Sequence, residues 1–405
     1  MALSNTTRSY GSVAKTFHWL TALLIFSVIP LGWVANELAH AIEAGGADAT
    51  EVVRAATLFS LHKTIGVTIF FVALARILWA LFQEKPGLLN ADNRPEALAA
   101  ETVHWLLYGS LVFVPLTGWV HHAATTGFAP IWWPFGQSLP FVPKSEALAE
   151  ITAGLHWVLI WVLVGSLGLH IAGALKHHVV DRDSTLRRML PGRSDAPQPP
   201  DSRHGVGPVF AALVVWGIAL GAGSWIGAYS HETATGEQAA LDQVESEWQV
   251  TEGTLGLTVT QLGSPVDGSF ADWTAAITFA EPAEPGPAGN VNVTVSIPSL
   301  TLGSVTQQAL GADFFAAEEY PTARFEAEIV KTEAGYEARG PLTIRDQSVP
   351  ITLPFSLDIA GDTARMTGSV TVNRLDFNVG QNMADESSVA FAVDIDVALT
   401  ATRGE

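Results

Sequence analysis

Five histidines lie within, or at the start of, long apolar stretches of the sequence: His18, His62, His104, His156 and His170. Ionisable side chains are costly inside a lipid bilayer, so residues of this kind are functional candidates by default. The chain has no cysteine, which excludes disulfides, thiolate metal sites and covalently attached haem. A metal in this protein must therefore be held by histidine, carboxylate or neutral oxygen atoms.

The most informative pair is His156 and His170, which share a stretch with no charged residue between Ile151 and Leu175. In a helix their spacing is roughly 21 Å along the axis and within about 40° of four full turns. Both imidazoles then point to nearly one face at opposite depths. Neutral imidazole is a good axial ligand for haem iron, and bundles build cofactor sites from facing helices. The spacing therefore indicates a bundle that holds two haems.

Composition and hydropathy supply the elements that would carry these histidines. The chain is 48% hydrophobic and only 15% charged, against roughly 25% charged in a typical soluble protein. Five apolar stretches are each long enough to span a membrane at about 20 residues. They run over residues 13–35, 57–82, 103–124, 151–175 and 208–229.

Loop charge predicts the orientation and hence the histidine partners. Lys and Arg concentrate before the first stretch, after the second and after the fourth, which places the N-terminus in the cytoplasm. His18 and His170 then lie near the cytoplasmic face, whereas His62 and His156 lie near the outer face. We expect two bis-histidine haems, one on each pair. The alternative is that each histidine only hydrogen-bonds to a neighbouring helix.

The other histidines of the apolar half leave two interpretations open. His104 is either an interfacial residue or part of a quinone site. His177 and His178, beside basic residues at the inner end of the fourth stretch, are either solvated or bind a quinone head group together with Lys85. His121 and His122 fall at the outer end of the third stretch, where they are either solvated or help an outer substrate site.

Residues Tyr10 to Pro191 resemble the bacterial cytochrome b561 family, whose members include a superoxide oxidase. The matching strings are TFHW, SLHKTIG, VHW and GLHWVLIWVLVGSLGLHIAGALKHHVVDRDSTLRRMLP. The resemblance implies a four-helix core with two b-type haems and ubiquinone as the inner redox partner. It also implies that His18, His62, His156 and His170 are the iron ligands, and that Lys85 with His177 or His178 contacts the quinone.

The C-terminal part of the chain has a different character. From Tyr229 onward there are 26 acidic and 7 basic residues, which accounts for the whole formal charge of −19. This acidic half argues against nucleic-acid binding. From Glu247 onward apolar and polar residues alternate, as in GTLGLTVTQL and VPITLPFSLDI. The alternation predicts about eight half-buried strands in an antiparallel barrel or sandwich, which can enclose one elongated ligand.

The segment from Trp248 to the end resembles the YceI-like family, which has a lipocalin-like fold that binds polyisoprenoid chains. The best strings are GADFFAAEEYPTARFEAEIV, GPLTIRDQSVPITLPF and MTGSVTVNRLDFNVG. The chain departs from the family's polar pairs at Glu252-Gly253 and Gln308-Ala309, which puts a head-group contact in doubt. Four residues are candidates to line a ligand cavity: Phe314, Phe315, Tyr320 and Phe325. The alternative is that they are ordinary core residues of the barrel.

Together these observations predict a multidomain membrane protein. A four-helix transmembrane di-haem bundle (residues 8–192) precedes a linker with one extra transmembrane helix (193–247, helix about 208–229) and an all-β antiparallel lipocalin-like barrel (248–403). The predicted function is membrane electron transfer from a periplasmic donor, superoxide by family resemblance, to ubiquinone. We expect it in the bacterial inner membrane, with the C-terminal domain in the periplasm. The alternative is a membrane-anchored polyisoprenoid lipid-binding or carrier protein.

Overall fold

The computed structural model describes residues 2–43, 49–125, 127, 129–192, 196–200, 205–229, 241, 244–383, 386 and 388–404. Much of the predicted linker 193–247 lies outside these residues. The chain divides into two compact units. The first comprises Met1–Val34, Leu58–Thr125 and Ile131–Glu232, and the second comprises Ala35–Thr57, Thr126–Pro130 and Thr233–Glu405.

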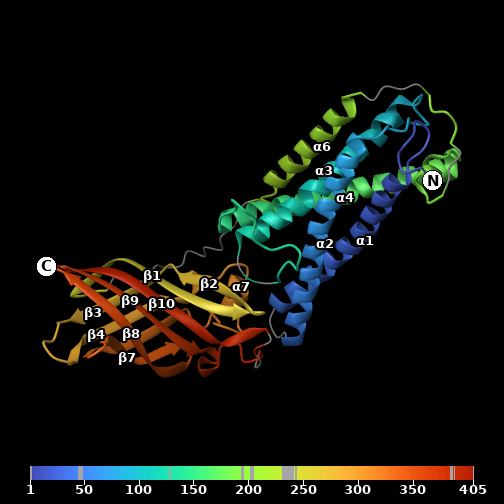
Figure 1. Cartoon of the computed structure of the whole chain (residues 1–405). Helices are drawn as coiled ribbons and strands as arrows, with labels where there is room; N and C mark the ends of the chain where they lie inside the picture. The colour runs from blue at the N-terminus through green and yellow to red at the C-terminus, as the bar shows by residue number, and fades with distance from the viewer. Residues whose placement is uncertain are drawn as a thin grey trace. The chain divides into compact units, whose positions relative to one another are not determined.

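The apolar half folds as helices, as predicted (Figure 1). Their bounds are α1 Ser12–Glu43, α2 Ala49–Leu81, α3 Arg94–Ala124, α4 Glu146–Lys176, the short α5 Thr185–Met189 and α6 Gly207–Trp225. In the described part of the chain, five of them are long and apolar enough to cross a membrane, which confirms the predicted number. Large apolar side chains such as Leu23 and Phe210 lie exposed on these helices, as expected for surfaces that face lipid.

Helix α4 shows how the sequence sets these elements. It begins at Ser145, whose side chain accepts a hydrogen bond from the Leu148 backbone N–H, a standard N-cap interaction. The helix then passes into a π-helical turn, His177–Asp181, which ends at Arg182 in the left-handed conformation (φ 55°). The π turn changes the direction of the side chains at this end of the helix, and such turns are frequent at functional sites.

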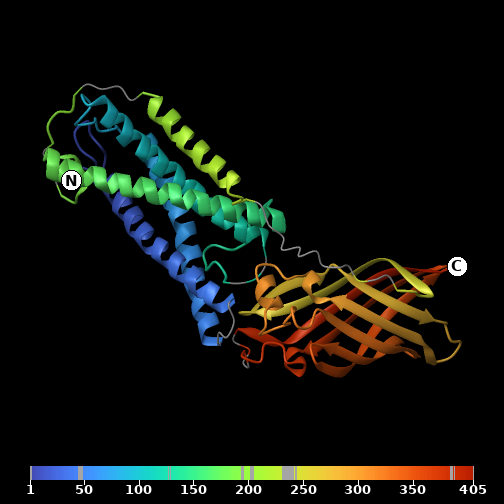
Figure 2. The same cartoon turned by 180° about the vertical axis from the view of Figure 1, so that it is seen from behind.

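Apolar side chains hold the bundle together. Ile25 and Val28 of α1 cluster with Ile69 of α2 and Leu111 of α3. Helix α6 lies beside α3 and α4, which both views of the molecule show (Figures 1 and 2). Its Ala212 is buried in a cluster with residues from those two helices. Helix α6, the fifth of the long apolar helices, therefore packs onto the outside of the bundle formed by α1 to α4.

In its described residues the second unit contains an antiparallel ten-stranded sheet that curls around an apolar interior, against about eight strands predicted. The strands, in sequence order, are β1 Trp248–Gln261, β2 Ser264–Phe270, β3 Trp273–Phe279, β4 Gly286–Ser296, β5 Leu300–Thr301, β6 Thr322–Thr332, β7 Gly335–Ile344, β8 Gln347–Ala360, β9 Thr363–Asn373 and β10 Val389–Arg403. They hydrogen-bond in the order β3-β4-β6-β7-β8-β9-β10-β1-β2-β5. Strand β5 has only two residues, so alternation along the sequence could not predict it.

Alternation along the strands decides which residues face inward. In β6 every second residue from Ala323 to Ile329 is buried, while the intervening residues are exposed. This period of two is the geometry of a strand with one buried face. Phe325 and Ala327 of β6 cluster with Ala338 of β7 and Leu353 of β8, which forms part of the wall around the interior.

Candidate functional site: paired histidines and an apolar cavity

The helical unit brings His62 of α2 and His156 of α4 together. Their ring centres are 6.5 Å apart and the ring planes are nearly perpendicular, at 84°. The Nδ1 atom of His62 lies 2.9 Å from the Val28 carbonyl oxygen, and that of His156 lies 2.8 Å from the Val114 carbonyl oxygen. A carbonyl oxygen only accepts, so each Nδ1 carries the proton and each Nε2 keeps a lone pair for a metal.

A second pair forms between His18 of α1 and His170 of α4, whose ring centres are 6.0 Å apart. His104 of α3 is also close to His170, at 5.1 Å between ring centres. Two metal–nitrogen bonds of about 2 Å on opposite sides of one metal put the ring centres roughly 6 Å apart. The two predicted pairs match that spacing, whereas His104 and His170 are closer than it requires.

Two glycines make room for the first pair. A Cβ atom on Gly32 of α1 would lie 2.6 Å from the His62 ring, and one on Gly118 of α3 would lie 3.0 Å from the His156 ring. Real Cβ contacts essentially never approach to 2.6 Å. Glycine at these positions therefore lets each imidazole pack directly against a neighbouring helix backbone.

The glycines belong to an internal repeat that our reading of the sequence missed. The pattern T-x-H-W-L occurs in α1 and again in α3, and a G-W pair follows each of its histidines at the same distance along the chain. The second helix of each hairpin repeats too, because Arg76 follows His62 by the same interval as His170 follows His156. His62 and His156 are thus equivalent positions. His104 of α3 corresponds to His18 of α1, and Arg76 of α2 corresponds to His170 of α4. Arg76 cannot ligate a metal, because its guanidinium stays protonated.

Substituting Gly32 tests the packing of His62. We expect Gly32→Ala to displace the His62 ring, because the added Cβ has no room, and the purified protein to lose most of the haem that the sequence predicts for that pair. Gly118→Ala, with its wider spacing, should have a smaller effect. Haem content per chain measures both. Gly221→Ala in α6 is the control, since a Cβ there meets no atom within 4 Å. Normal haem content in Gly32→Ala would contradict the expected packing.

The predicted quinone contacts fall into two separate ion-pair clusters. His177 is buried, with its Nδ1 atom 2.7 Å from Asp183 Oδ2 and 3.1 Å from Asp181 Oδ2. Lys85 is exposed and its ammonium lies 3.5 Å from Glu101 of α3. His178 is exposed. In the described residues, therefore, Lys85 and His177 each contact a different glutamate of α3.

The cluster around His177 has the composition of a metal site but already contains its own cation. Ligand atoms of Glu96, His177 and Asp181 lie within 4.8 Å of one another. The Lys176 ammonium is 2.5 Å from Glu96 Oε1 and 2.8 Å from Asp181 Oδ2. A lysine in this position neutralises the carboxylates that would otherwise attract a metal ion.

A group of basic side chains lies beside the His62–His156 pair. Lys63 is buried and acts electrostatically on both His121 and His122. The rings of His121 and His122 are 4.6 Å apart, and His121 Nδ1 lies 2.7 Å from the Ala149 carbonyl oxygen. The two histidines are therefore partly buried within this group rather than solvated in a loop.

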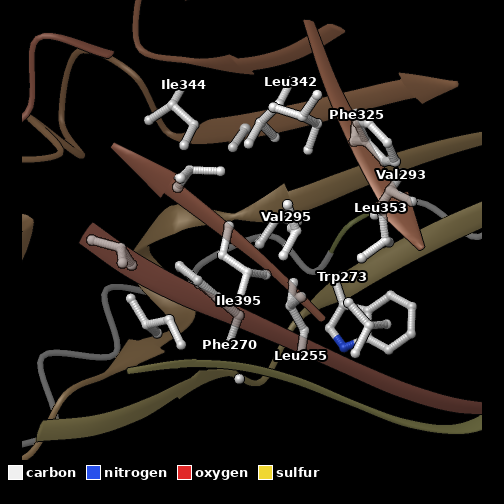
Figure 3. A pocket seen from close by; sticks show the side chains of 18 of the residues that line it. Leu255, Phe270, Trp273, Val293, Val295, Phe325, Leu342, Ile344, Leu353 and Ile395 are labelled. Carbon is white, nitrogen blue, oxygen red and sulfur yellow. The ribbon is translucent and has the colours of Figure 1, made fainter. Parts of the chain in front are cut away.

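The second unit encloses an apolar cavity of about 280 Å³ within the sheet (Figure 3). The labelled side chains of Val293, Phe325 and Leu353 are typical of its wall. The lining includes Phe314, Phe315 and Phe325, as predicted, but not Tyr320, over whose ring the Arg345 guanidinium lies at 5.7 Å. Tyr320 falls between α7 (Thr306–Leu310) and β6, where strand alternation does not fix its direction.

The one arginine among the lining residues, Arg374, is engaged with the backbone. Its guanidinium donates to the carbonyl oxygens of Val379, Gly380, Met383, Val389 and Ala390, at 2.5 to 3.1 Å. These bonds tie the segment after β9 to the start of β10. Because they occupy the Nε, Nη1 and Nη2 atoms of the side chain, Arg374 serves the structure of the wall rather than a ligand's charge.

These features define a two-part protein: a membrane-spanning helical bundle with paired histidines and an all-β domain around an apolar cavity. Residues 9–192 match the family described as prokaryotic cytochrome b561, and residues 240–401 match the YceI-like domain. The chain belongs to the cytochrome b561 family and carries a fused YceI-like domain. That family implies electron transfer and b-type haem, and the imidazole spacing, free Nε2 atoms and flanking glycines fit such a cofactor.

Similar proteins cover each half separately. Cytochrome b561 homolog 2 of Escherichia coli strain K12 is 30% identical over 200 residues, which are 48% of this chain and 98% of that protein. The probable superoxide oxidase CybB of Yersinia pestis is 25% identical over 185 residues, 45% of this chain and 97% of that protein. The crystal structure of Burkholderia cenocepacia BcnA is 31% identical and covers 37% of this chain and 96% of its own, with a TM-score of 0.34.

Proposed function

We propose that this protein carries electrons across the bacterial inner membrane through two b-type haems, from a periplasmic donor to ubiquinone. The observation that carries the proposal is the meeting of two imidazole pairs at positions roughly four helical turns apart along α4. His62 with His156 would hold one haem and His18 with His170 the other. Haem iron, when bound, supplies reversible one-electron transfer.

The chain's own residues prepare these sites. The backbone carbonyls of Val28 and Val114 hold the Nδ1 protons of His62 and His156, which orients both rings toward a shared metal position. The positive-inside pattern supports a cytoplasmic N-terminus, with the pair on His18 and His170 at the cytoplasmic side. The domain limits proposed from the sequence, 8–192, 193–247 and 248–403, then put the acidic β-domain in the periplasm.

Superoxide is the donor that we propose, on two grounds. Lys63 lies beside the outer pair together with His121 and His122, and a lysine ammonium steers an anion toward a site. One relative is named a probable superoxide oxidase. In the overall reaction two superoxide anions each lose one electron to give O₂, and one ubiquinone gains the two electrons and two protons. Lys85, His177 and His178 are the proposed contacts of the quinone head group.

We further propose that the β-domain binds a neutral isoprenoid lipid, such as a quinone. Apart from Gln261, Gln308 and Arg374, its cavity is lined by apolar side chains, and Arg374 has no donor left for a carboxylate or phosphate head group. The same observation supports the second candidate function, a membrane-anchored carrier of polyisoprenoid lipid. The carrier requires no paired histidines, so loss of function in histidine variants separates the two candidates.

Superoxide-dependent quinone reduction tests the proposed function. We expect the purified, haem-loaded full chain to accelerate reduction of a soluble ubiquinone analogue by enzymatically generated superoxide. His156→Ala, which breaks the outer pair, should abolish the acceleration, because the donor's electron then has no entry point. Quinone reduction is followed optically with superoxide dismutase as the control. Equal rates with and without the protein would exclude superoxide as the donor.

A further inference from the structure

Arg188 of α5 is an unusual residue because it is only 5% exposed and only partly hydrogen-bonded. Its Nη1 donates to the Gly87 carbonyl oxygen at 2.8 Å. Its Nε and Nη2 atoms are buried and have no hydrogen-bond partner among the described residues. Burying charged N–H groups without hydrogen-bond acceptors is costly, so we expect a ligand to supply acceptors for Nε and Nη2.

The two free atoms lie on the same edge of the guanidinium. The N–H groups of Nε and Nη2 point in parallel, and this edge forms paired hydrogen bonds with the two oxygens of a carboxylate. A single lone acceptor, such as a ketone oxygen, would satisfy only one of them. The geometry of the free edge therefore selects a carboxylate or a similar anion.

Hydrogen bonds hold the segment of Arg188 next to the start of α1, which carries His18. Trp19 Nε1 donates to the Met189 carbonyl oxygen at 2.9 Å. The buried ammonium of Lys15 donates to the carbonyl oxygens of Leu190 and Gly192, each at 2.9 Å. Both donors lie within one helical turn of His18, so Arg188 belongs to the same end of the bundle as the His18–His170 pair.

The groups around Arg188 leave its free edge without an acidic hydrogen-bond partner. Burial lowers the pKa of Arg188, and burial followed by repulsion from Tyr108 raises the pKa of Tyr10, whose ring lies 5.7 Å from the guanidinium. Asp183 is the nearby acid, but its carboxylate is occupied by His177 Nδ1 and the Thr185 backbone N–H, both at 2.7 Å. Arg76, which acts on both Tyr10 and His18, adds a further cation.

We propose that Arg188 binds a propionate carboxylate of the haem held by His18 and His170. This inference rests on the proposed function, because it requires a haem at that pair. Haem b carries two propionates, and a buried arginine with a free two-donor edge neutralises one of them inside a region of low dielectric. The bond would hold the edge of the haem in place and stabilise its reduced, more negative state.

Redox titration of the haem-loaded full chain tests this contact with Arg188→Gln. We expect both haems to be retained and one of them to become harder to reduce, because a neighbouring cation is lost. The reduction equilibrium constant should fall roughly tenfold, or about 59 mV for one electron. Arg187→Gln is the matched control, since Arg187 lies on the same short helix without being buried. Equal potentials in Arg188→Gln and the control would overturn the proposal.

A second substitution assigns the shift to one haem. In the His156→Ala background, which keeps the inner pair, Arg188→Gln should still lower the potential. In the His170→Ala background it should have no effect, and a shift there would overturn the proposal. If Arg188→Gln does not fold, Arg188→Lys is tested instead, with haem labelled by ¹³C at its propionate carboxyls. The carboxylate band in the infrared redox-difference spectrum should then move relative to wild type. A band that does not move would refute the contact. A wild-type protein without haem would refute the proposed function itself.

Discussion

Purified His156→Ala and His170→Ala proteins should each contain about one haem per chain, where we expect about two in the wild type. The reason is geometric: each substitution removes one of two imidazoles whose ring centres lie 6.5 Å and 6.0 Å apart, and a haem in a helical bundle is poorly held by one ligand alone. His156→Ala should remove the haem of His62, and His170→Ala the haem of His18. Pyridine haemochrome assays and reduced-minus-oxidised spectra measure the loss.

Two control variants sharpen this experiment. His178→Ala changes an exposed histidine in the π turn that continues α4, and it should keep both haems. His104→Ala tests which of the two imidazoles next to His170 is the second ligand. The His104 ring is too close to the His170 ring for the two to share a metal, so this variant should also keep both haems. Loss of the inner haem in His104→Ala, with retention in His18→Ala, would reverse the assignment of that ligand. Two haems in both His156→Ala and His170→Ala would refute the whole ligand set.

The second large effect is expected in the β-domain, where Val293→Trp should strip the protein of bound isoprenoid lipid. Val293 lines the cavity, so the indole would occupy the space of the ligand (Figure 3). Overpacking of this kind costs about 1–3 kcal/mol, which corresponds to a loss of roughly fivefold to 150-fold in affinity. Lipid extracted from the purified full chain and quantified by mass spectrometry gives the occupancy.

The adjacent residue provides the matched control. Asn292 lies on the same strand with its side chain on the opposite, exposed face, so Asn292→Trp adds the same ring outside the cavity. It should leave the lipid content unchanged. Circular dichroism of both variants verifies that the sheet is intact. Lipid retained equally by folded Val293→Trp and Asn292→Trp would show that the cavity is not the binding site.

Local patterns in the sequence were sufficient for the large elements and for the histidine pairs. Long apolar runs predict spanning helices, and the described part of the chain has five such helices. The spacing of His156 and His170 predicts two levels on one helix face, and the structure places His62 and His18 opposite them. Whether each pair holds a haem stays a prediction for the experiments above.

The sequence also predicted strands by alternation, because a period of two follows from the pleat of a strand. It therefore identified Phe325 as an inward-facing residue. The direction of Tyr320 was not predictable in this way, since it lies outside a strand. Nor does alternation say whether the interior of the sheet is filled or hollow, because that depends on the curvature of the sheet and on the volumes of side chains from many strands.

What the sequence by itself determined is the kind and order of the elements, and the depth of each histidine along its helix. Only the tertiary structure decided which atoms are left for ligands. Gly32 of α1 meets His62 of the next helix, His177 turns toward Asp183 in a π turn, and Arg188 is buried with one edge of its guanidinium free. Such contacts depend on how separate segments pack and on which hydrogen bonds remain unmade, and the periodicity of a single segment carries no information about either.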